Sequence, residues 1–439
     1  MSISVNREIL RLAIPNILSN ISVPLISAVD TALMGRLSIE HLGAVGLGSM
    51  IFNFIYWNFG FLRMGTTGIT AQSFGRDDHL STRLILARSL GIALIISVVL
   101  ICLYTPLCQA SLYLMNVSET QVPLVSTYFS IRICAAPATL MLYVFMGWFF
   151  GMQNAVYPLI ITVIINVINL LLSYLFVVEL NWEINGVAWG TVIAQYIGVI
   201  LSSYLLYKKY RSTFSVRWND LKGKFQEWTQ VLRVNSFLFV RTVCLTFAFA
   251  VFYAESSKTG AIILATNVVL LQFLNWISYG IDGFAFASES LVGRFFGAKD
   301  QYHLKKVINY SFIWGFILAL FYALLFYYFD AEIVGIFTNS AEVLDYASEL
   351  TIWMIALPLM AFGCYIWDGV YIGLTEVKMM MYAMILSLTI YLVMIYGKMD
   401  LGVHHIWISL IFFLFVRGVI QACLWKLSIE KRIYQIIDL

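Results

Sequence analysis

The sequence predicts an all-α membrane protein whose twelve transmembrane helices form two pseudo-symmetric lobes of six helices each. Composition is the first observation behind this fold class: of the 439 residues, 61% are hydrophobic and 12% are charged, whereas soluble domains carry about 25% charged residues. A helical crossing needs about 20 apolar residues, so the chain has room for about twelve crossings and for little else. This composition excludes a soluble enzyme and a disordered chain.

Apolar runs bounded by charged or turn residues locate the helices. Long runs without strand alternation favour helices over a barrel, because every backbone polar group in lipid must be bonded internally. We expect helices at residues 9–33, 42–74, 81–108, 121–147, 156–178, 186–207, 230–254, 260–293, 303–329, 343–371, 376–396 and 402–426.

An internal repeat with an offset of 222 residues relates the two halves. It aligns, without a gap, Leu10-Arg11 with Leu232-Arg233, Asn53 with Asn275, Phe74-Gly75 with Phe296-Gly297, and Gly147-x-x-x-Gly151 with Gly369-x-x-x-Gly373. Six helices per repeat preserve orientation, so we expect a pseudo-twofold axis along the membrane normal and a binding region between the lobes. The paired glycines predict close helix packing, and Gly75 and Gly297 are typical of capping glycines after a helix.

The distribution of basic residues predicts the topology. With both termini placed in the cytoplasm, most of the 27 Lys and Arg residues fall on the cytoplasmic side, as the positive-inside rule requires. The basic connection at 208–229 divides an N-terminal lobe, 1–207, from a C-terminal lobe, 230–439. The small net charge of +3 gives no reason to expect nucleic acid as a partner.

Asp30 is the clearest candidate for chemistry, because ionisable side chains inside a bilayer are costly and usually face a cavity. It lies six residues after Pro24, which has no N–H to donate to the carbonyl of Asn20, and helices kink at such prolines. We expect Pro24 to act as a hinge that responds to the protonation of Asp30. The alternative is a solvated carboxylate at the end of the first helix.

A polar stripe marks the fifth predicted helix. Asn166, Asn169 and Ser173 follow the i, i+3, i+7 spacing that places side chains on one helix face. Together with Thr191 in the sixth helix, they are candidates for a cation-coupling pocket. Hydrogen bonding between helices is the simpler alternative, since Asn and Ser commonly serve that role in membranes.

The second half offers a polar network of Arg241, Asp282 and Asp368. A buried arginine without a carboxylate would be costly, so we expect Arg241 to pair with Asp282 or Asp368, as a structural or a working pair. The six scattered cysteines and the adjacent His404 and His405 predict no metal site. We expect no cofactor and find no ATPase or hydrolase motif.

Several segments resemble the multidrug and toxic compound extrusion (MATE) family, and within it the DinF branch. They are Asp30-Thr-Ala-Leu-Met-Gly35-Arg-Leu-Ser-Ile-Glu-His-Leu-Gly-Ala-Val45, Arg241-Thr242, Asp282-Gly-Phe-Ala-Phe-Ala-Ser-Glu289-Ser-Leu-Val-Gly293-Arg-Phe-Phe-Gly297-Ala and Trp367-Asp368-Gly369-Val-Tyr-Ile-Gly373. The resemblance covers essentially the whole chain. It implies two six-helix lobes forming a V, and export by antiport against protons or sodium ions.

The resemblance also assigns roles. Asp30 matches the cation-coupling aspartate of the family's first helix. Asn169 and Ser173 fall where related members carry an Asn and an Asp one turn apart, and Thr191 falls near their threonine in the sixth helix. At Ser173 a hydroxyl replaces the carboxylate, which disfavours sodium, since hard cations prefer charged oxygen ligands; we expect protons as the coupling ion, with sodium as the alternative.

The function that follows is a secondary transporter of a bacterial inner membrane, multi-pass and monomeric, that exports small organic compounds, cationic or amphipathic, by proton antiport. A flippase for lipid-linked precursors is the rival, and it would need cationic residues such as Arg241 to hold phosphates. A membrane enzyme acting on lipids would need an acid–base or metal cluster, which the sequence does not offer. A scaffold or channel is disfavoured by the repeat and the polar stripe.

Overall fold

The computed structural model describes residues 4–34, 39–211, 225–338, 340–397 and 402–438. Within α1, Val5–Met34, the side chains of residues 23–34 lie outside the described residues. The chain clusters into two compact units. We call residues 18–74 and 78–235 the N-terminal unit, and residues 1–17, 75–77 and 236–439 the C-terminal unit.

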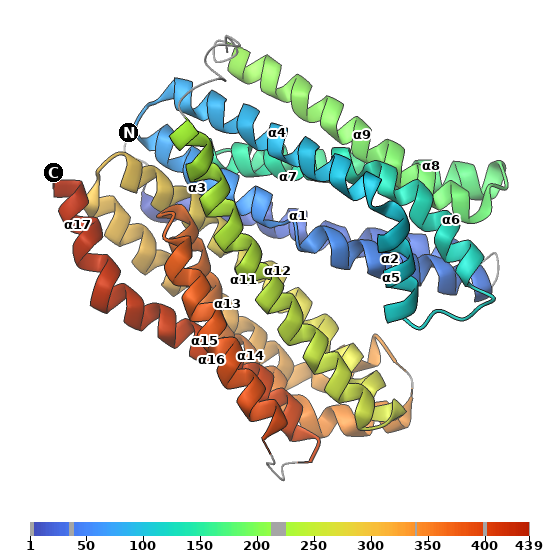
Figure 1. Ribbon diagram of the computed structural model, residues 1–439. Helices are drawn as coiled ribbons and strands as arrows, with labels where there is room; N and C mark the ends of the chain where they lie inside the picture. Colours follow the sequence, from blue (N-terminus) through green and yellow to red (C-terminus); the bar gives the residue numbers. More distant parts are fainter. Residues whose placement is uncertain (1–3, 35–38, 212–224, 339, 398–401, 439) are drawn as a thin grey trace. The chain divides into compact units, whose positions relative to one another are not determined.

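The described part of the N-terminal unit consists of helices (Figure 1), several of which follow one another closely enough to count as one candidate membrane span. They are α2 (Ile39–Trp57), α3 (Phe61–Gly75), α4 (His79–Cys102), α5 (Tyr104–Leu114), α6 (Val122–Arg132), the short η1 (Ile133–Ala135), α7 (Ala136–Gly151), α8 (Val156–Tyr174), η2 (Leu175–Glu179) and α9 (Glu183–Tyr210). Within this unit α8 packs on α9, α4 on α7, and α6 on α2 and α9.

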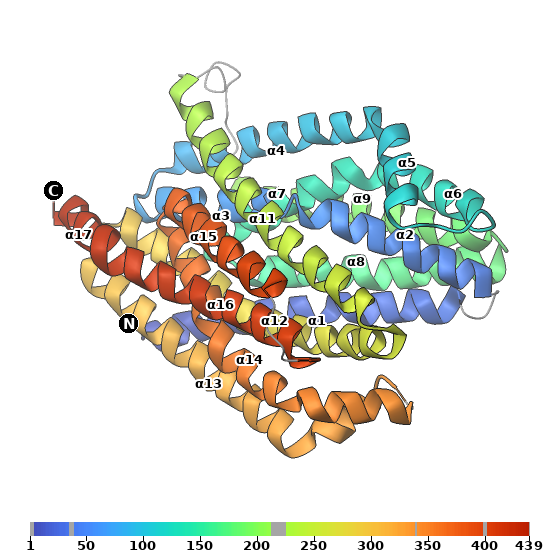
Figure 2. The same cartoon turned by 60° about the horizontal axis from the view of Figure 1, so that its bottom comes forward.

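The C-terminal unit is built around α14, Ala341–Gly373 (Figure 2). Its other helices are α11 (Phe225–Lys258, from Ser236 on), α12 (Ala261–Gly297), α13 (Gln301–Gly335), α15 (Val377–Tyr396), α16 (His404–Leu424), η4 (Trp425–Ile429) and α17 (Glu430–Asp438). Because α12, α13 and α16 all pack against α14, α14 is the central helix of this unit.

Eleven helical stretches in the described residues are long and apolar enough to cross a membrane. They correspond to the second to twelfth predicted helices, and α1 corresponds to the first. No strand occurs in the described part of the chain. The predicted all-helical membrane fold is confirmed.

Three predicted helices are divided, and two of the breaks have a proline as their cause. The prediction of one continuous helix over 81–108 is wrong, since α4 ends at Cys102. The carbonyl of Cys102 is the one to which residue 106, a proline, would donate in a continuous helix. The 121–147 prediction is interrupted at Ile133–Ala135, and Ile133 is the i−4 partner of Pro137. A proline cannot donate to that carbonyl and clashes with it. The 42–74 prediction breaks at a turn, residues 58–60.

The 222-residue repeat reappears as repeated backbone packing. A Cβ on Gly147 of α7 would collide with the carbonyl oxygen of Arg63 on α3, and a Cβ on Gly369 of α14 would collide with that of Ala285 on α12. Both residues of the first pair shift by 222 positions to give the second pair. One turn later the same close approach recurs: a Cβ on Gly151 would collide with the carbonyl oxygen of Thr67, and a Cβ on Gly373 would collide with that of Glu289. The glycine motifs therefore pack helices closely, as predicted.

The turns after α3 and α12 also repeat. Asp78 accepts a hydrogen bond from the Ser81 N–H at 2.9 Å, and Asp300 accepts one from the His303 N–H at 3.0 Å, so each caps the next helix. The residue in the left-handed region is Asp77 (φ 58°) in one turn and Lys299 (φ 56°) in the other. The expectation that Gly75 and Gly297 cap their helices is wrong, since both are the last helical residues.

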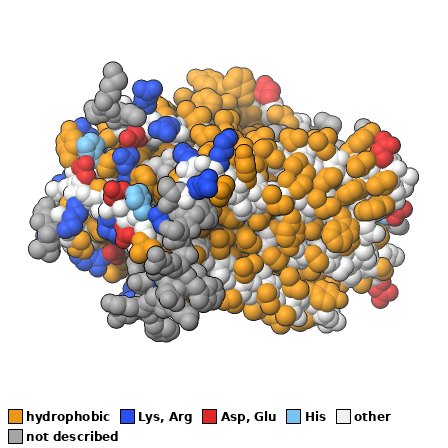
Figure 3. Space-filling model, turned by 90° about the horizontal axis from the view of Figure 1, so that it is seen from above, with side chains coloured by type: hydrophobic (Ala, Val, Ile, Leu, Met, Phe, Trp, Pro, Cys, Tyr) orange, Lys and Arg blue, Asp and Glu red, His pale blue; other side chains and the backbone are white. Residues whose placement is uncertain are grey.

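Basic residues predominate at one end of the described C-terminal unit and acidic residues at the other, although Asp300, Glu376, Glu430 and Asp438 lie at the basic end and Lys258 lies at the acidic end. One end, which we call the basic end, holds Arg294, Lys299, Lys305, Lys306, Lys378, Lys426, Lys431 and Arg432. The opposite end of the same helices holds the acids Glu255, Asp330, Glu332, Glu342, Asp345 and Glu349. On the face drawn in Figure 3, Lys and Arg also gather at one end, and hydrophobic side chains cover most of the remainder.

A substitution on α14 tests the packing. We expect Gly369→Ala to lower stability by about 1–3 kcal/mol, because the new methyl group must push α12 away. On the same helix, Gly363 has nothing within 4 Å of its Cβ position, so Gly363→Ala should be neutral or stabilising. Thermal unfolding of both variants in detergent measures the difference; equal midpoints would contradict the close approach.

Candidate functional site

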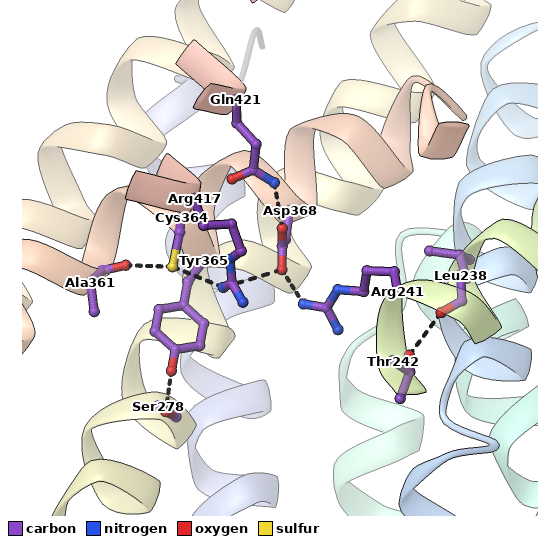
Figure 4. Close-up of polar contacts among 10 residues, drawn as sticks. All are labelled: Leu238, Arg241, Thr242, Ser278, Ala361, Cys364, Tyr365, Asp368, Arg417 and Gln421. Carbon is purple, nitrogen blue, oxygen red and sulfur yellow. Dashed lines mark hydrogen bonds and ion pairs between the residues drawn. The ribbon is translucent and has the colours of Figure 1, made fainter. Parts of the chain in front are cut away.

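A buried charge cluster joins α11, α14 and α16 within the C-terminal unit, near the end of α14 (Figure 4). Asp368 of α14 forms an ion pair with Arg241 of α11, and its Oδ2 lies 3.6 Å from the Nη2 of Arg417 on α16. Gln421, one turn after Arg417, donates to the Oδ1 of Asp368 at 2.7 Å. We call these four residues the α14 charge cluster. Asp368 and Arg241 are each 6% exposed, and Arg417 is 1% exposed.

Further contacts fix the guanidinium of Arg417. Its Nη2 lies 2.8 Å from the sulfur of Cys364, and its Cζ lies 5.6 Å from the centre of the Tyr365 ring. The hydroxyl of Tyr365 is in turn hydrogen-bonded to Ser278 of α12 at 2.7 Å. The cluster thus joins α11, α12, α14 and α16 through polar contacts, which are the means by which membrane helices associate without a hydrophobic driving force.

The cluster has little capacity left for a coupling cation. Both oxygens of Asp368 are already engaged, Oδ2 by two guanidiniums and Oδ1 by an amide. Two positive charges face one negative charge, so a further cation would meet net repulsion. Removing the acid would leave two buried guanidiniums unpaired, which is strongly unfavourable. The cluster therefore joins three helices by ion pairs and offers no free carboxylate oxygen.

Sequence reasoning identified part of this cluster. Two acids are expected as partners of Arg241, and in the structure Arg241 pairs with Asp368. Asp282 lies half-buried on α12, one turn after Ser278. Arg417 and Gln421 were not predicted as members. Their signal was an arginine inside an apolar span with a polar residue four positions later, the spacing that places both on one helix face.

The predicted polar stripe of α8 lies in the N-terminal unit and faces two neighbouring helices. Towards α9, Asn169 donates to the hydroxyl of Thr191 at 2.9 Å, and that hydroxyl donates to the carbonyl of Val187. Towards α1, Asn166 donates to the hydroxyl of Ser22 at 3.0 Å. The structure therefore brings Asn169 and Thr191 together, as predicted, and adds a contact with α1.

Two buried polar atoms of the stripe, an amide oxygen and a hydroxyl, have no hydrogen-bond partner within the described residues. They are the Oδ1 of Asn169 and the Oγ of Ser173. Asn169 is 3% exposed and Ser173 is fully buried, and Gly190 of α9 packs directly against Ser173. A buried polar atom without a partner costs about 1–3 kcal/mol, so these two atoms call for a partner that the described side chains do not supply, such as a water or another polar group.

The predicted hinge and coupling residues lie on α1. Pro24 and Asp30 belong to the helical backbone of α1, but their side chains lie outside the described residues. Ser19 donates to Thr162 at 3.1 Å, just as Ser22 accepts from Asn166. Residue numbers increase together on the two helices, so this part of α1 runs parallel to α8.

The two adjacent histidines have separate partners. His404 accepts from the indole of Trp353 at 2.9 Å, and His405 contacts the carbonyl of Ile395 at 2.9 Å. A search of the described residues finds no group of three or more His, Cys, Asp or Glu residues that could hold a metal ion.

Comparison with known proteins places the chain in a family. The sequence profile of the MatE family matches residues 15–175 and 238–397. The DNA damage-inducible protein F of Escherichia coli (strain K12) is 31% identical over 425 residues, which are 96% of this chain and 92% of that protein. The probable multidrug resistance protein NorM of Thermotoga maritima is 23% identical over 364 residues, covering 80% of this chain and 76% of that protein.

The fold is shared with solved structures. A crystal structure of a MATE protein in complex with MaL6 has a TM-score of 0.88 at 19% identity and covers 97% of both chains. Since the profile covers both halves of the repeat and a relative is 31% identical over nearly the whole chain, the chain belongs to the MatE family of multidrug and toxic compound extrusion transporters and is a membrane transporter, not an enzyme.

Proposed function

We propose that this protein exports small organic compounds across a bacterial inner membrane by antiport against protons, and that the proton binds in the N-terminal unit between Asp30 and the α8 polar stripe. The observation that carries the proposal is the pair of buried polar atoms without partners, Asn169 Oδ1 and Ser173 Oγ. The names of the relatives, which refer to multidrug resistance and toxin extrusion, support the class of substrate.

Helical geometry supports the place of Asp30. Ser22 and Asn166 are hydrogen-bonded to each other on parallel helices. Asp30 follows Ser22 by eight residues and Ser173 follows Asn166 by seven. At about 1.5 Å per residue, these steps correspond to about 12 Å along α1 and about 10.5 Å along α8. The backbone of Asp30 is therefore at nearly the height of Ser173.

The unpartnered polar atoms suit a protonated carboxyl group. A neutral aspartic acid has one O–H to donate, and Ser173 Oγ or Asn169 Oδ1 can accept it. An ionised Asp30 can accept from the Ser173 hydroxyl but offers Asn169 Oδ1 no proton, and it adds a charge to an apolar region, which is costly. Protonation of Asp30 would thus favour closure of α1 onto α8, with Pro24, two residues after Ser22, as the hinge.

The C-terminal unit does not repeat the polar stripe at the offset of 222, which supports coupling in the N-terminal unit. At the offset of 222, Asp30 corresponds to Phe252 and Thr191 corresponds to Phe413. The three stripe residues, Asn166, Asn169 and Ser173, correspond in order to Leu388, Tyr391 and Ile395. Of the acids inside the helices of the C-terminal unit, Asp368 is held by two arginines, and Asp282 and Glu289 lie on α12. One lobe therefore carries the polar pocket and the other carries the fixed charge cluster.

The rival function, flipping of lipid-linked precursors, is weakened by the same cluster. It would require a cationic residue free to hold a phosphate. Arg241, the candidate for that role, is 6% exposed and paired with Asp368.

We further propose that the basic end faces the cytoplasm, as the positive-inside rule predicts, which places both termini there, and that the protein acts as a monomer.

Asp30→Asn tests the coupling directly. In liposomes loaded with a fluorescent cationic dye, an imposed pH gradient should drive efflux by the wild type, and in the variant efflux should fall to the passive leak, because the amide cannot bind and release a proton. Glu342→Gln, which removes an exposed acid at the start of α14, is the control and should keep the wild-type rate. Full efflux by Asp30→Asn would refute the proposal, and efflux driven only by a sodium gradient would replace the proton by sodium.

Ser173→Ala tests the role of the stripe. In the proposed geometry Ser173 Oγ accepts from the neutral carboxyl, and losing that hydrogen bond, about 1 kcal/mol, makes proton binding harder, so half-maximal efflux should need an outside pH lower by about 0.7 units. A shift to higher pH would mean that the hydroxyl donates to the ionised carboxylate instead. Ser203→Ala, at an exposed position on α9, should leave the pH profile unchanged. An unshifted profile in Ser173→Ala would separate the stripe from proton binding.

A further inference from the structure

A groove opens at the basic end of the C-terminal unit, between α13 and the end of α16. It encloses about 450 Å³ and is lined by Lys305, Asn309, Trp367, Trp425, Lys426 and Tyr434, among others. Helix α14 forms its floor, since α13 and α16 both pack on α14, and η4 and α17 bound its end. We call this cavity the α13–α16 groove; in Figure 2 its helices lie in the C-terminal unit beside the C-terminus.

The groove carries an excess of positive charge. The Nζ of Lys426 lies 3.6 Å from Glu430. The Nζ of Lys305 lies 4.2 Å from the centre of the Tyr434 ring, and no carboxylate in the described part of the chain pairs with it. Two ammonium groups therefore face one carboxylate, and Lys305 is left with a cation–π contact as its main interaction. The groove has the charge of a site for an anion.

Tryptophans line the inner wall of the groove. The rings of Trp367 and Trp425 lie 5.6 Å apart, and Phe312 lies 4.9 Å from Trp367. Trp side chains are enriched at the level of lipid headgroups, where an apolar ring and a polar N–H are both accommodated. An aromatic wall of this kind suits the level of the lipid headgroups.

Exposed apolar side chains continue from the groove along both helices. On α13, Phe316 follows Phe312 by one turn and is 47% exposed. On α16, Val419 and Phe415 precede the groove residue Ala422 by one and two turns, and they are 43% and 40% exposed. These residues lie on the helix faces that line the groove. An apolar track thus leads from the charged pocket towards the middle of the membrane.

We propose that the α13–α16 groove binds one anionic glycerophospholipid. Its phosphodiester lies between Lys305 and Lys426, its glycerol backbone lies against Trp367 and Trp425, and its acyl chains follow Phe316, Val419 and Phe415. Basic pockets between transmembrane helices recognise anionic headgroups in this way. A free phosphate shares the chemistry of the headgroup, but only a lipid accounts for the apolar track beside it.

Native mass spectrometry of the detergent-purified protein tests the site. Titration with phosphatidylglycerol should give one bound lipid that resists added inorganic phosphate, and phosphatidylcholine should bind more weakly. In the double variant Lys305→Gln/Lys426→Gln the affinity for that lipid should fall about 25-fold, at about fivefold per lysine. The measurement does not depend on transport, so it remains informative if the proposed function fails.

A matched double variant separates the groove from general surface charge. Lys306→Gln/Lys431→Gln removes two lysines next to the groove, on α13 and α17, and should change the affinity by less than about twofold. Equal losses in both double variants, or no loss in either, would overturn the proposal. Displacement of the lipid by inorganic phosphate would also overturn it, because the occupant would then be a soluble phosphate.

Discussion

A bilayer provides no water to solvate polar groups, and the rest of this structure depends on that constraint. Backbone groups must pair within helices, so the described chain is helical throughout its crossings. Helices in lipid gain little from apolar contact and must pack closely or bond through polar groups. The protein uses both solutions, with glycines against backbone carbonyls at Gly147 and Gly369 and with a cluster that ties α16 and α11 to Asp368.

The repeat separates architecture from chemistry. Packing glycines, helix caps and left-handed turn residues recur at the offset of 222, as in the pairs Asp78 and Asp300 or Asp77 and Lys299. The polar sites do not recur. The stripe of α8 corresponds to apolar residues of α15, and Asp368 corresponds to Met146. Two lobes with one backbone plan therefore carry different polar groups, which supports a division of work between a lobe that binds the coupling proton and a lobe that keeps a fixed charge arrangement.

Helix positions could be predicted from the sequence because hydropathy and chain length decide them. The i, i+3, i+7 spacing of Asn166, Asn169 and Ser173 likewise predicted one face, since helical geometry alone decides which residues share it. Partners across helices were harder. Arg241 pairs with Asp368 and not with Asp282 because of the way α11, α14 and α16 pack. The same packing brings Arg417 and Gln421 into the α14 charge cluster, and no local sequence pattern encodes it. The helix breaks before Pro106 and Pro137 could have been predicted from the i−4 clash.

We propose that one carboxyl group, Asp30, exchanges the coupling proton while Asp368 stays engaged by its arginines. Proton release on substrate binding, counted in a weakly buffered solution of purified protein, measures this directly. We expect about one proton per molecule from the wild type and from Asp368→Asn that elutes as a folded monomer, and none from Asp30→Asn. Release that persists in Asp30→Asn, or that is lost in a folded Asp368→Asn, would contradict the account.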